Sequence, residues 1–195
     1  FTHKKIPVFK TSNIRYFLSK VSAKFYKIKP KNIIAVTGTN GKTSVADLFY
    51  QILSINKVPV ASIGTLGIKY NKRLIKSDLT TPDTISLHQS LERIKSKKID
   101  NVIIEASSHG LHQQRLDHLN MNAGIFTNFS QDHLDYHKTM SSYLKAKMLL
   151  FNRVLSKKKK IISDESIKEY KKLVKISKDR KLYLIGIKKI KKKIE

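Results

Sequence analysis

The chain has 195 residues, 40% of them hydrophobic and 28% charged, a formal net charge of +26, and no cysteine. The length suffices for one α/β domain, the composition excludes a disordered chain, and no apolar run is long enough to span a membrane. The absence of cysteine excludes disulfides and thiolate metal sites, which fits the reducing cytoplasm, where we expect the protein to act.

The first thirty residues differ in pattern from the rest of the chain. Residues 13–26 have the apolar spacing of an amphipathic helix, and Lys29-Pro30 provides a break after it. We expect residues 1–30 to be the end of a preceding domain and its linker, and residues 31–195 to form the main domain.

From residue 32 onwards, strand and helix patterns alternate. Short apolar runs predict strands, and apolar residues at helical spacing predict helices. This alternation predicts an α/β fold with a mostly parallel sheet flanked by helices, and a solvated end at 188–195. The predicted strands are 32–38, 58–68, 101–108, 123–129 and 181–187, and the predicted helices are 44–55, 84–96, 140–155 and 167–176.

The segment VTGTNGKTS (36–44) connects the first of these strands to a helix. Its glycines allow the backbone N–H groups to face a phosphate, and the helix N-terminus adds positive potential. Lys42 is placed to reach the β- and γ-phosphates of a nucleotide, and the Thr43 hydroxyl to bind Mg²⁺. Val36 stands where the general phosphate-loop pattern has glycine. The predicted ATP-binding residues are Gly38, Thr39, Asn40, Gly41, Lys42, Thr43 and Ser44.

This loop resembles the variant phosphate loop of the Mur ligase superfamily, which also includes folylpolyglutamate synthetase. Three later segments, LTTPD (79–83), EASSHGLHQQRL (105–116) and FTNFSQDHLDYHKTMSSYLKAK (126–147), are similar to one branch of it. That branch extends UDP-N-acetylmuramoyl-L-alanyl-D-glutamate by a third amino acid in peptidoglycan synthesis. The resemblance implies a P-loop-type central domain, ATP and Mg²⁺ as cofactors, and an acyl-phosphate intermediate.

The resemblance also implies a division into domains and a second substrate. Residues 1–30 would end a uridine-nucleotide domain, and 31–195 would form an incomplete ATP-binding domain without the C-terminal domain that binds the amino acid. We expect this stretch alone to be inactive, and we expect a monomer. The incoming diamino acid is diaminopimelate or lysine. In many family members an Asp-Asn-Pro-Arg motif selects diaminopimelate. This motif does not occur in the chain, so we favour diaminopimelate only because it is the commoner choice.

Two segments carry candidate metal ligands. Glu105 lies near the carboxyl end of a buried strand, where ligands bind in open α/β sheets, and the resemblance implies that it holds Mg²⁺. QDHLDYH (131–137) contains two histidines and two aspartates, a set that could also suit zinc or iron. The resemblance instead implies that His133 contributes to a second Mg²⁺, and we expect His137 to be structural.

Lys147 matches a family lysine that CO₂ converts to a carbamate. That reaction needs a neutral amine, which burial promotes by lowering the pKa. The resemblance implies that the resulting anion helps to bind the second Mg²⁺, so that Lys42, His133 and Lys147 form the catalytic set. Lys145, two residues earlier, would point elsewhere on the helix.

The muramoyl dipeptide would be bound by residues with hydroxyl, amide and guanidinium groups, which suit a sugar, a peptide and a carboxylate. Family members often have an asparagine directly before the two threonines that match Thr80 and Thr81, and this chain has Leu79 there. The matching residues are Thr80, Thr81, Ser107, Gln113 and Arg115.

Two alternative functions remain. Folylpolyglutamate synthetase would use the same loop, but SSHGLHQQR followed by DHLDYH disfavours it. The charge of +26 could indicate a nucleic-acid-binding module. Because most basic residues are lysine, whereas proteins that read base sequence rely on arginine, we expect no nucleic-acid partner.

Overall fold

The computed structural model describes residues 8–188, which fold around an eight-stranded sheet in the order β4-β3-β2-β5-β1-β6-β7-β8. The strands from β2 to β8 in this order are parallel, and β3 and β4 pair antiparallel at one edge. This confirms the prediction of a mostly parallel sheet. The strands are β1 Asn32–Thr37, β2 Val60–Gly64, β3 Gly67–Tyr70, β4 Arg73–Ile75, β5 Asn101–Glu105, β6 Ala123–Phe126, β7 Lys160–Asp164 and β8 Tyr183–Ile187.

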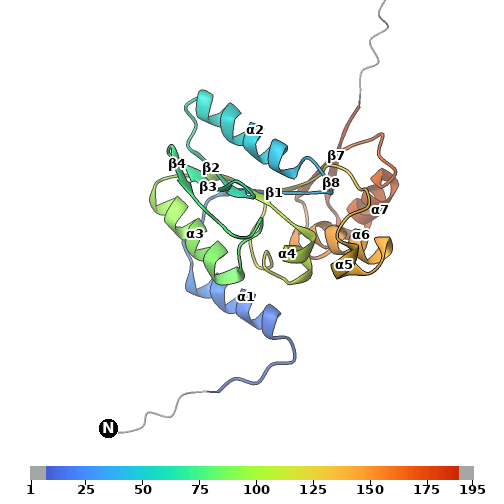
Figure 1. Ribbon diagram of the computed structural model, residues 1–195, viewed down its shortest axis with the longest axis horizontal. Helices are drawn as coiled ribbons and strands as arrows, with labels where there is room; N and C mark the ends of the chain where they lie inside the picture. Colours follow the sequence, from blue (N-terminus) through green and yellow to red (C-terminus); the bar gives the residue numbers. More distant parts are fainter. Residues whose placement is uncertain (1–7, 189–195) are drawn as a thin grey trace, which may run out of the picture.

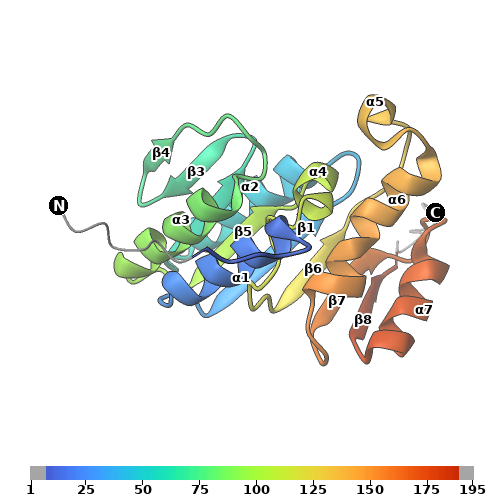
Figure 2. The ribbon, with the colours of Figure 1, turned by 90° about the horizontal axis from the view of Figure 1, so that it is seen from below.

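Helices flank both faces of the sheet. Figure 1 shows α2 (Lys42–Ile55) on one face and α3 (Thr84–Ser96), α4 (Ser108–His112), α6 (Met140–Leu149) and α7 (Tyr170–Arg180) on the other. In Figure 2, the four-residue α5 (Leu134–His137) projects beyond the end of α6. Among residues 8–188, no helix combines the length and apolar character needed to cross a bilayer.

The main apolar core lies between the sheet and the helices of the α3 side. Leu87, Leu91 and Ile94 form the buried face of α3, as their helical spacing predicts, and none of the three has solvent exposure. A smaller cluster on the other face includes Val36 and Ala46, beneath α2. Because the parallel strands are covered by helices, their sequences are nearly continuous apolar runs rather than alternating ones.

α1 (Ile14–Phe25) packs against α3 on the side away from the sheet (Figure 1). The side chain of Asn13 caps it by accepting from the Tyr16 N–H at 3.0 Å. The buried Ser19 hydroxyl donates to the Asp117 carbonyl over 2.7 Å, which ties α1 to the main domain. The helix predicted at 13–26 is confirmed, whereas its assignment to a preceding domain stays a prediction.

Several elements differ from the prediction. The extended segment expected at 58–68 is a hairpin, because the chain turns after Gly64 and Gly67 adopts a φ of 93° where a side chain would meet the Ile75 carbonyl. The helix expected at 140–155 continues beyond α6 as a π-helix, Leu150–Val154. The short helices α4 and α5 and the strand β7 were not predicted as such. Of the solvated end expected at 188–195, all but Lys188 lies outside the described residues.

Candidate active site

The phosphate loop lies where β1 ends and α2 begins. Gly41 is the N-cap of α2 with a φ of 81°, and a side chain on Gly38 would collide with the Thr127 hydroxyl. The N–H of Thr39 donates to the Asn128 carbonyl at 2.9 Å, so the segment after β6 holds the loop from outside. The first N–H groups of a helix have no partner within it, and those of α2 thus remain available to a phosphate.

Lys42 folds back over this loop. Its Nζ donates to the carbonyls of Gly38 at 3.0 Å and Thr39 at 2.8 Å. Burial lowers the pKa of the Lys42 ammonium, and the negative charges of Glu105 and Asp132 oppose this effect. The ammonium therefore lies on the loop that would receive the phosphates.

Lys147 reaches the same carbonyl from α6. Its side chain is buried, its Nζ donates to the Gly38 carbonyl over 2.6 Å, and it lies 4.3 Å from the centre of the Tyr143 ring. Burial, and then the charge of Lys42, lower the pKa of Lys147 to about 7. Near neutral pH a large fraction is therefore the neutral amine that reaction with CO₂ requires. Lys145 is exposed, as expected.

Glu105 ends β5 beside the loop, and its carboxyl group is buried. It accepts hydrogen bonds from the Thr43 hydroxyl at 2.8 Å, the Thr65 N–H at 2.9 Å and the Thr65 hydroxyl at 3.2 Å. A cavity of about 10 Å³ lies against Thr43 and Glu105. Mg²⁺ prefers oxygen ligands and takes only one or two from a protein beside phosphates, so a hydroxyl and a carboxylate here fit Mg²⁺.

The zinc or iron alternative finds no support. Within residues 8–188, no three side chains of His, Cys, Asp or Glu come together in a way that could hold a metal ion. A protein site for zinc needs at least three such ligands. Mg²⁺ does not, because phosphates and water complete its shell.

The histidines of 131–137 surround Tyr143. His133 is the N-cap of α5, and its ring centre lies 5.9 Å from that of Tyr143, the ring that Lys147 also contacts. The structure thus brings His133 and Lys147 to the same side chain. His137 is buried with its ring centre 5.2 Å from that of Tyr143, in keeping with its expected structural role.

Four of the five predicted substrate residues, all except Thr80, form one hydrogen-bond network next to Glu105. The Thr81 hydroxyl donates to the Glu105 carbonyl at 2.7 Å and accepts from the Ser107 N–H at 2.9 Å. Arg115 donates to the Thr81 carbonyl and to Gln113 Oε1, each at 2.6 Å. Thr81 is almost fully buried, so it organises this network from within the protein.

Thr80 lies between the predicted substrate residues and Glu105, the candidate Mg²⁺ ligand. Its hydroxyl lies 3.1 Å from that of Thr65, which in turn contacts Glu105. Thr65 was not predicted, because a single threonine in a hairpin turn carries no pattern. The rings of Tyr136 and Tyr143 were also missed as site residues, although both lie within the segments that resemble the family.

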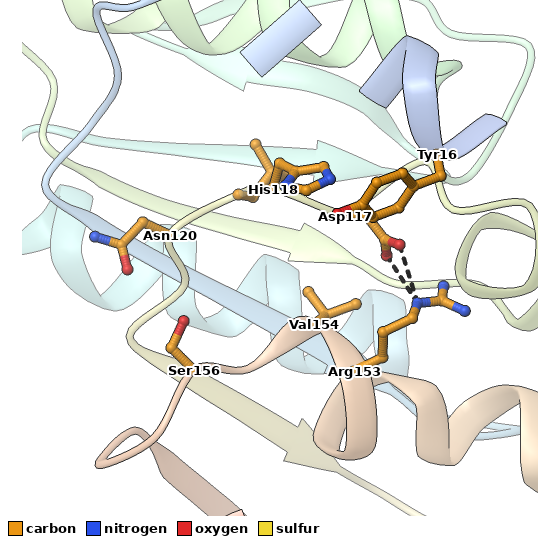
Figure 3. A pocket seen from close by; sticks show the side chains of 8 residues that line it. Tyr16, Asp117, His118, Asn120, Arg153, Val154 and Ser156 are labelled. Atoms are coloured by element: carbon orange, nitrogen blue, oxygen red, sulfur yellow. Dashed lines mark hydrogen bonds and ion pairs between the residues drawn. The ribbon is translucent and has the colours of Figure 1, made fainter. Parts of the chain in front are cut away.

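A separate cavity of about 500 Å³ lies at the opposite edge of the sheet, before β6 and β7. Figure 3 shows Tyr16 and His118 above it and the ion pair of Asp117 and Arg153 beside it, with a nitrogen–oxygen distance of 3.0 Å. It contains none of the predicted site residues. The candidate active site is therefore the phosphate-loop edge.

Comparison with known sequences identifies the family. Residues 36–195 match the family described as the Mur ligase middle domain. The chain belongs to the Mur ligase family. Its phosphate loop, Glu105 and Lys147 all fall within this Mur ligase domain.

Two relatives show which Mur ligases the chain is similar to. The UDP-N-acetylmuramoyl-L-alanyl-D-glutamate--2,6-diaminopimelate ligase of Brucella melitensis is 45% identical over 152 residues, or 78% of this chain and 31% of that protein. The ligase of the same name from Rickettsia bellii is 44% identical over 165 residues, or 82% of this chain and 34% of that protein. The chain thus spans about a third of the length of these relatives.

Solved structures agree with the Mur ligase fold. The structure of a UDP-N-acetylmuramoyl-L-alanyl-D-glutamate--2,6-diaminopimelate ligase has a TM-score of 0.80 at 26% identity, over 95% of this chain and 38% of that one. E. coli FolC in complex with DHPP and ADP has a TM-score of 0.67 at 16% identity, over 92% of this chain and 48% of that one. The likeness to FolC shows a shared fold.

Proposed function

We propose that this protein is an ATP-dependent amide ligase that adds a third amino acid to UDP-N-acetylmuramoyl-L-alanyl-D-glutamate. The main support is that the Lys42 ammonium lies on the phosphate loop, where its Nζ donates to the carbonyls of Gly38 and Thr39. A triphosphate that faces a substrate carboxylate concentrates negative charge, and a positive group fixed in advance stabilises it. Diaminopimelate is the proposed third residue, because relatives 44% and 45% identical carry it in their names.

In this reaction the γ-phosphoryl group of ATP passes to the free side-chain carboxylate of D-glutamate. The amine of the incoming amino acid then attacks the acyl phosphate, so that an amide forms and phosphate leaves. Lys42 and the N-terminus of α2 would bind the phosphates. Thr43 and Glu105 would hold Mg²⁺, which supplies charge neutralisation when bound. Positioning is the rest of the protein's contribution.

The remaining predicted residues act on the substrate and on a second metal ion. Arg115 and Gln113 would bind the peptide part of the muramoyl dipeptide, with Thr80 beside them. We propose that Lys147 carries a carbamate, which with His133 would hold a second Mg²⁺. We also propose that the ligase acts as a monomer in the cytoplasm, where ATP and nucleotide precursors are available.

Lys42→Ala tests the nucleotide part of this proposal. Isothermal titration calorimetry should show Mg-ATP affinity reduced at least tenfold, because a charged hydrogen bond contributes about 1.5–3 kcal/mol. Lys145→Ala, which removes an exposed lysine of α6, is the control and should bind Mg-ATP normally. An unchanged affinity in Lys42→Ala would exclude the phosphate-loop assignment. Salt-sensitive DNA binding that survives this substitution would favour the nucleic-acid alternative.

A further inference from the structure

Tyr136 lies on α5, next to the predicted substrate residues, and has no role in the function proposed above. Gln113 Nε2 donates to its hydroxyl oxygen over 3.3 Å, and the same oxygen lies 2.9 Å from Nδ1 of His112. Its ring centre lies 4.1 Å from that of His109 and 4.8 Å from that of His137. Tyr136 therefore contacts α4 and the residue after it through both its hydroxyl and its ring.

The orientation of the Gln113 amide follows from its partners. Arginine has no hydrogen-bond acceptor, so the amide oxygen must face Arg115, which donates to it from Nε at 3.1 Å and from Nη2 at 2.6 Å. The amide nitrogen then points to the oxygen of Tyr136. The hydroxyl of Tyr136 thus holds the amide nitrogen of Gln113, opposite the oxygen that Arg115 holds. The second N–H of this nitrogen remains for a substrate.

The ring of Tyr136 has a second effect, on the position of α5. This helix has only four residues, too few to be stable without packing, and it carries His133 at its N-cap. The tilted ring contact of Tyr136 with His109 links α5 to α4. One side chain thus connects the substrate-side pair Gln113 and Arg115 to the segment that bears the candidate metal ligand His133.

We propose that Tyr136 is a positioning residue for the muramoyl dipeptide. Its hydroxyl holds the amide of Gln113, and through it the guanidinium of Arg115, in the orientation that binds the peptide and its carboxylate. This inference rests on the proposed ligase function. Groups fixed before binding lose less freedom when the substrate arrives, so the loss of this hydroxyl should weaken substrate binding more than catalysis.

Tyr136→Phe in the complete ligase tests this proposal, because it removes the hydroxyl and keeps the ring. Steady-state kinetics should show a KM for the muramoyl dipeptide raised about fivefold, the effect of one neutral hydrogen bond. The kcat should stay within about twofold and the KM for ATP should not change. Tyr183→Phe is the matched control, because Tyr183 is exposed on β8, and it should leave all three constants unchanged.

Gln113→Ala and the double variant show whether Tyr136 acts through Gln113. We expect Tyr136→Phe to add nothing to the KM of Gln113→Ala, since residues acting through one contact are not additive. Additive effects, an unchanged KM, or a Tyr136→Phe protein that fails to fold would each overturn the proposal. If the wild-type ligase does not turn over the muramoyl dipeptide, the proposed function fails as well; if it does, only the role of Tyr136 is at stake.

Discussion

Because of His88, we expect the folded protein to lose stability in mild acid. The side chain has no solvent exposure, and neither ring nitrogen has a hydrogen-bond partner among the described residues. Burial, and then the charges of Lys29 and His118, lower its pKa from 6.5 to about 4. Between these values the unfolded chain binds a proton that the folded chain does not. Stability due to His88 is therefore complete above pH 6.5 and falls as the pH drops towards 4, by about 3 kcal/mol in total.

The substitution His88→Leu isolates this effect. Urea unfolding between pH 4 and pH 7 should show that the free energy of unfolding falls less steeply in the variant than in the wild type. Comparison with the wild type is needed because burial also lowers the pKa of His137 to about 4, so His137 contributes a slope of its own. Ile94→Val, a buried substitution on the same helix that involves no titratable group, is the control and should retain the wild-type slope. Equal slopes in His88→Leu and the wild type would refute the reasoning.

Two further predictions concern the phosphate-loop edge. Lys147→Ala in the complete ligase should abolish turnover, and acetate or formate should partly restore it by replacing the carbamate. The control Lys145→Ala should retain turnover without either acid. Full activity of Lys147→Ala in CO₂-depleted buffer would disprove the carbamate. Gly38→Ala should lower the midpoint of thermal unfolding and weaken Mg-ATP binding, because its methyl group would collide with the Thr127 hydroxyl, at a cost of about 1–3 kcal/mol. An unchanged midpoint would show that the loop can shift to accommodate the methyl group.

The sequence predicted the sheet and most of its helices because these depend on local apolar periodicity. The hairpin at β2 and β3 escaped prediction, since residues 58–68 are mainly apolar and the turn depends on the close approach of Gly67 to the backbone of β4. The π-helix after α6 was not predicted either, because the hydrogen-bond register of the helix changes there without a change in the apolar pattern of the sequence.

Residues in recognisable motifs could be placed from the sequence. The motifs put Glu105 and Lys147 near the phosphate loop, and the structure brings both side chains there, while their roles stay predictions. Thr65 was not predicted, because its role comes from the turn that places its N–H against Glu105, 40 residues later in the chain. Tyr136 lies inside a motif, but its contact with Gln113 exists only because the chain brings the side chain of Tyr136 from α5 to the end of α4.

The place of the Lys42 ammonium has a consequence for selectivity among nucleotides. Its Nζ lies on the carbonyls of Gly38 and Thr39, at the N-terminal end of α2. In the proposed function, this positive charge attracts each phosphate that enters the loop, and the attraction grows with the number of negative charges on the ligand. We therefore expect the loop to distinguish nucleotides by the length of their phosphate chain, while its backbone groups are indifferent to the base. Discrimination between adenine and other bases would then come from side chains outside residues 38–44.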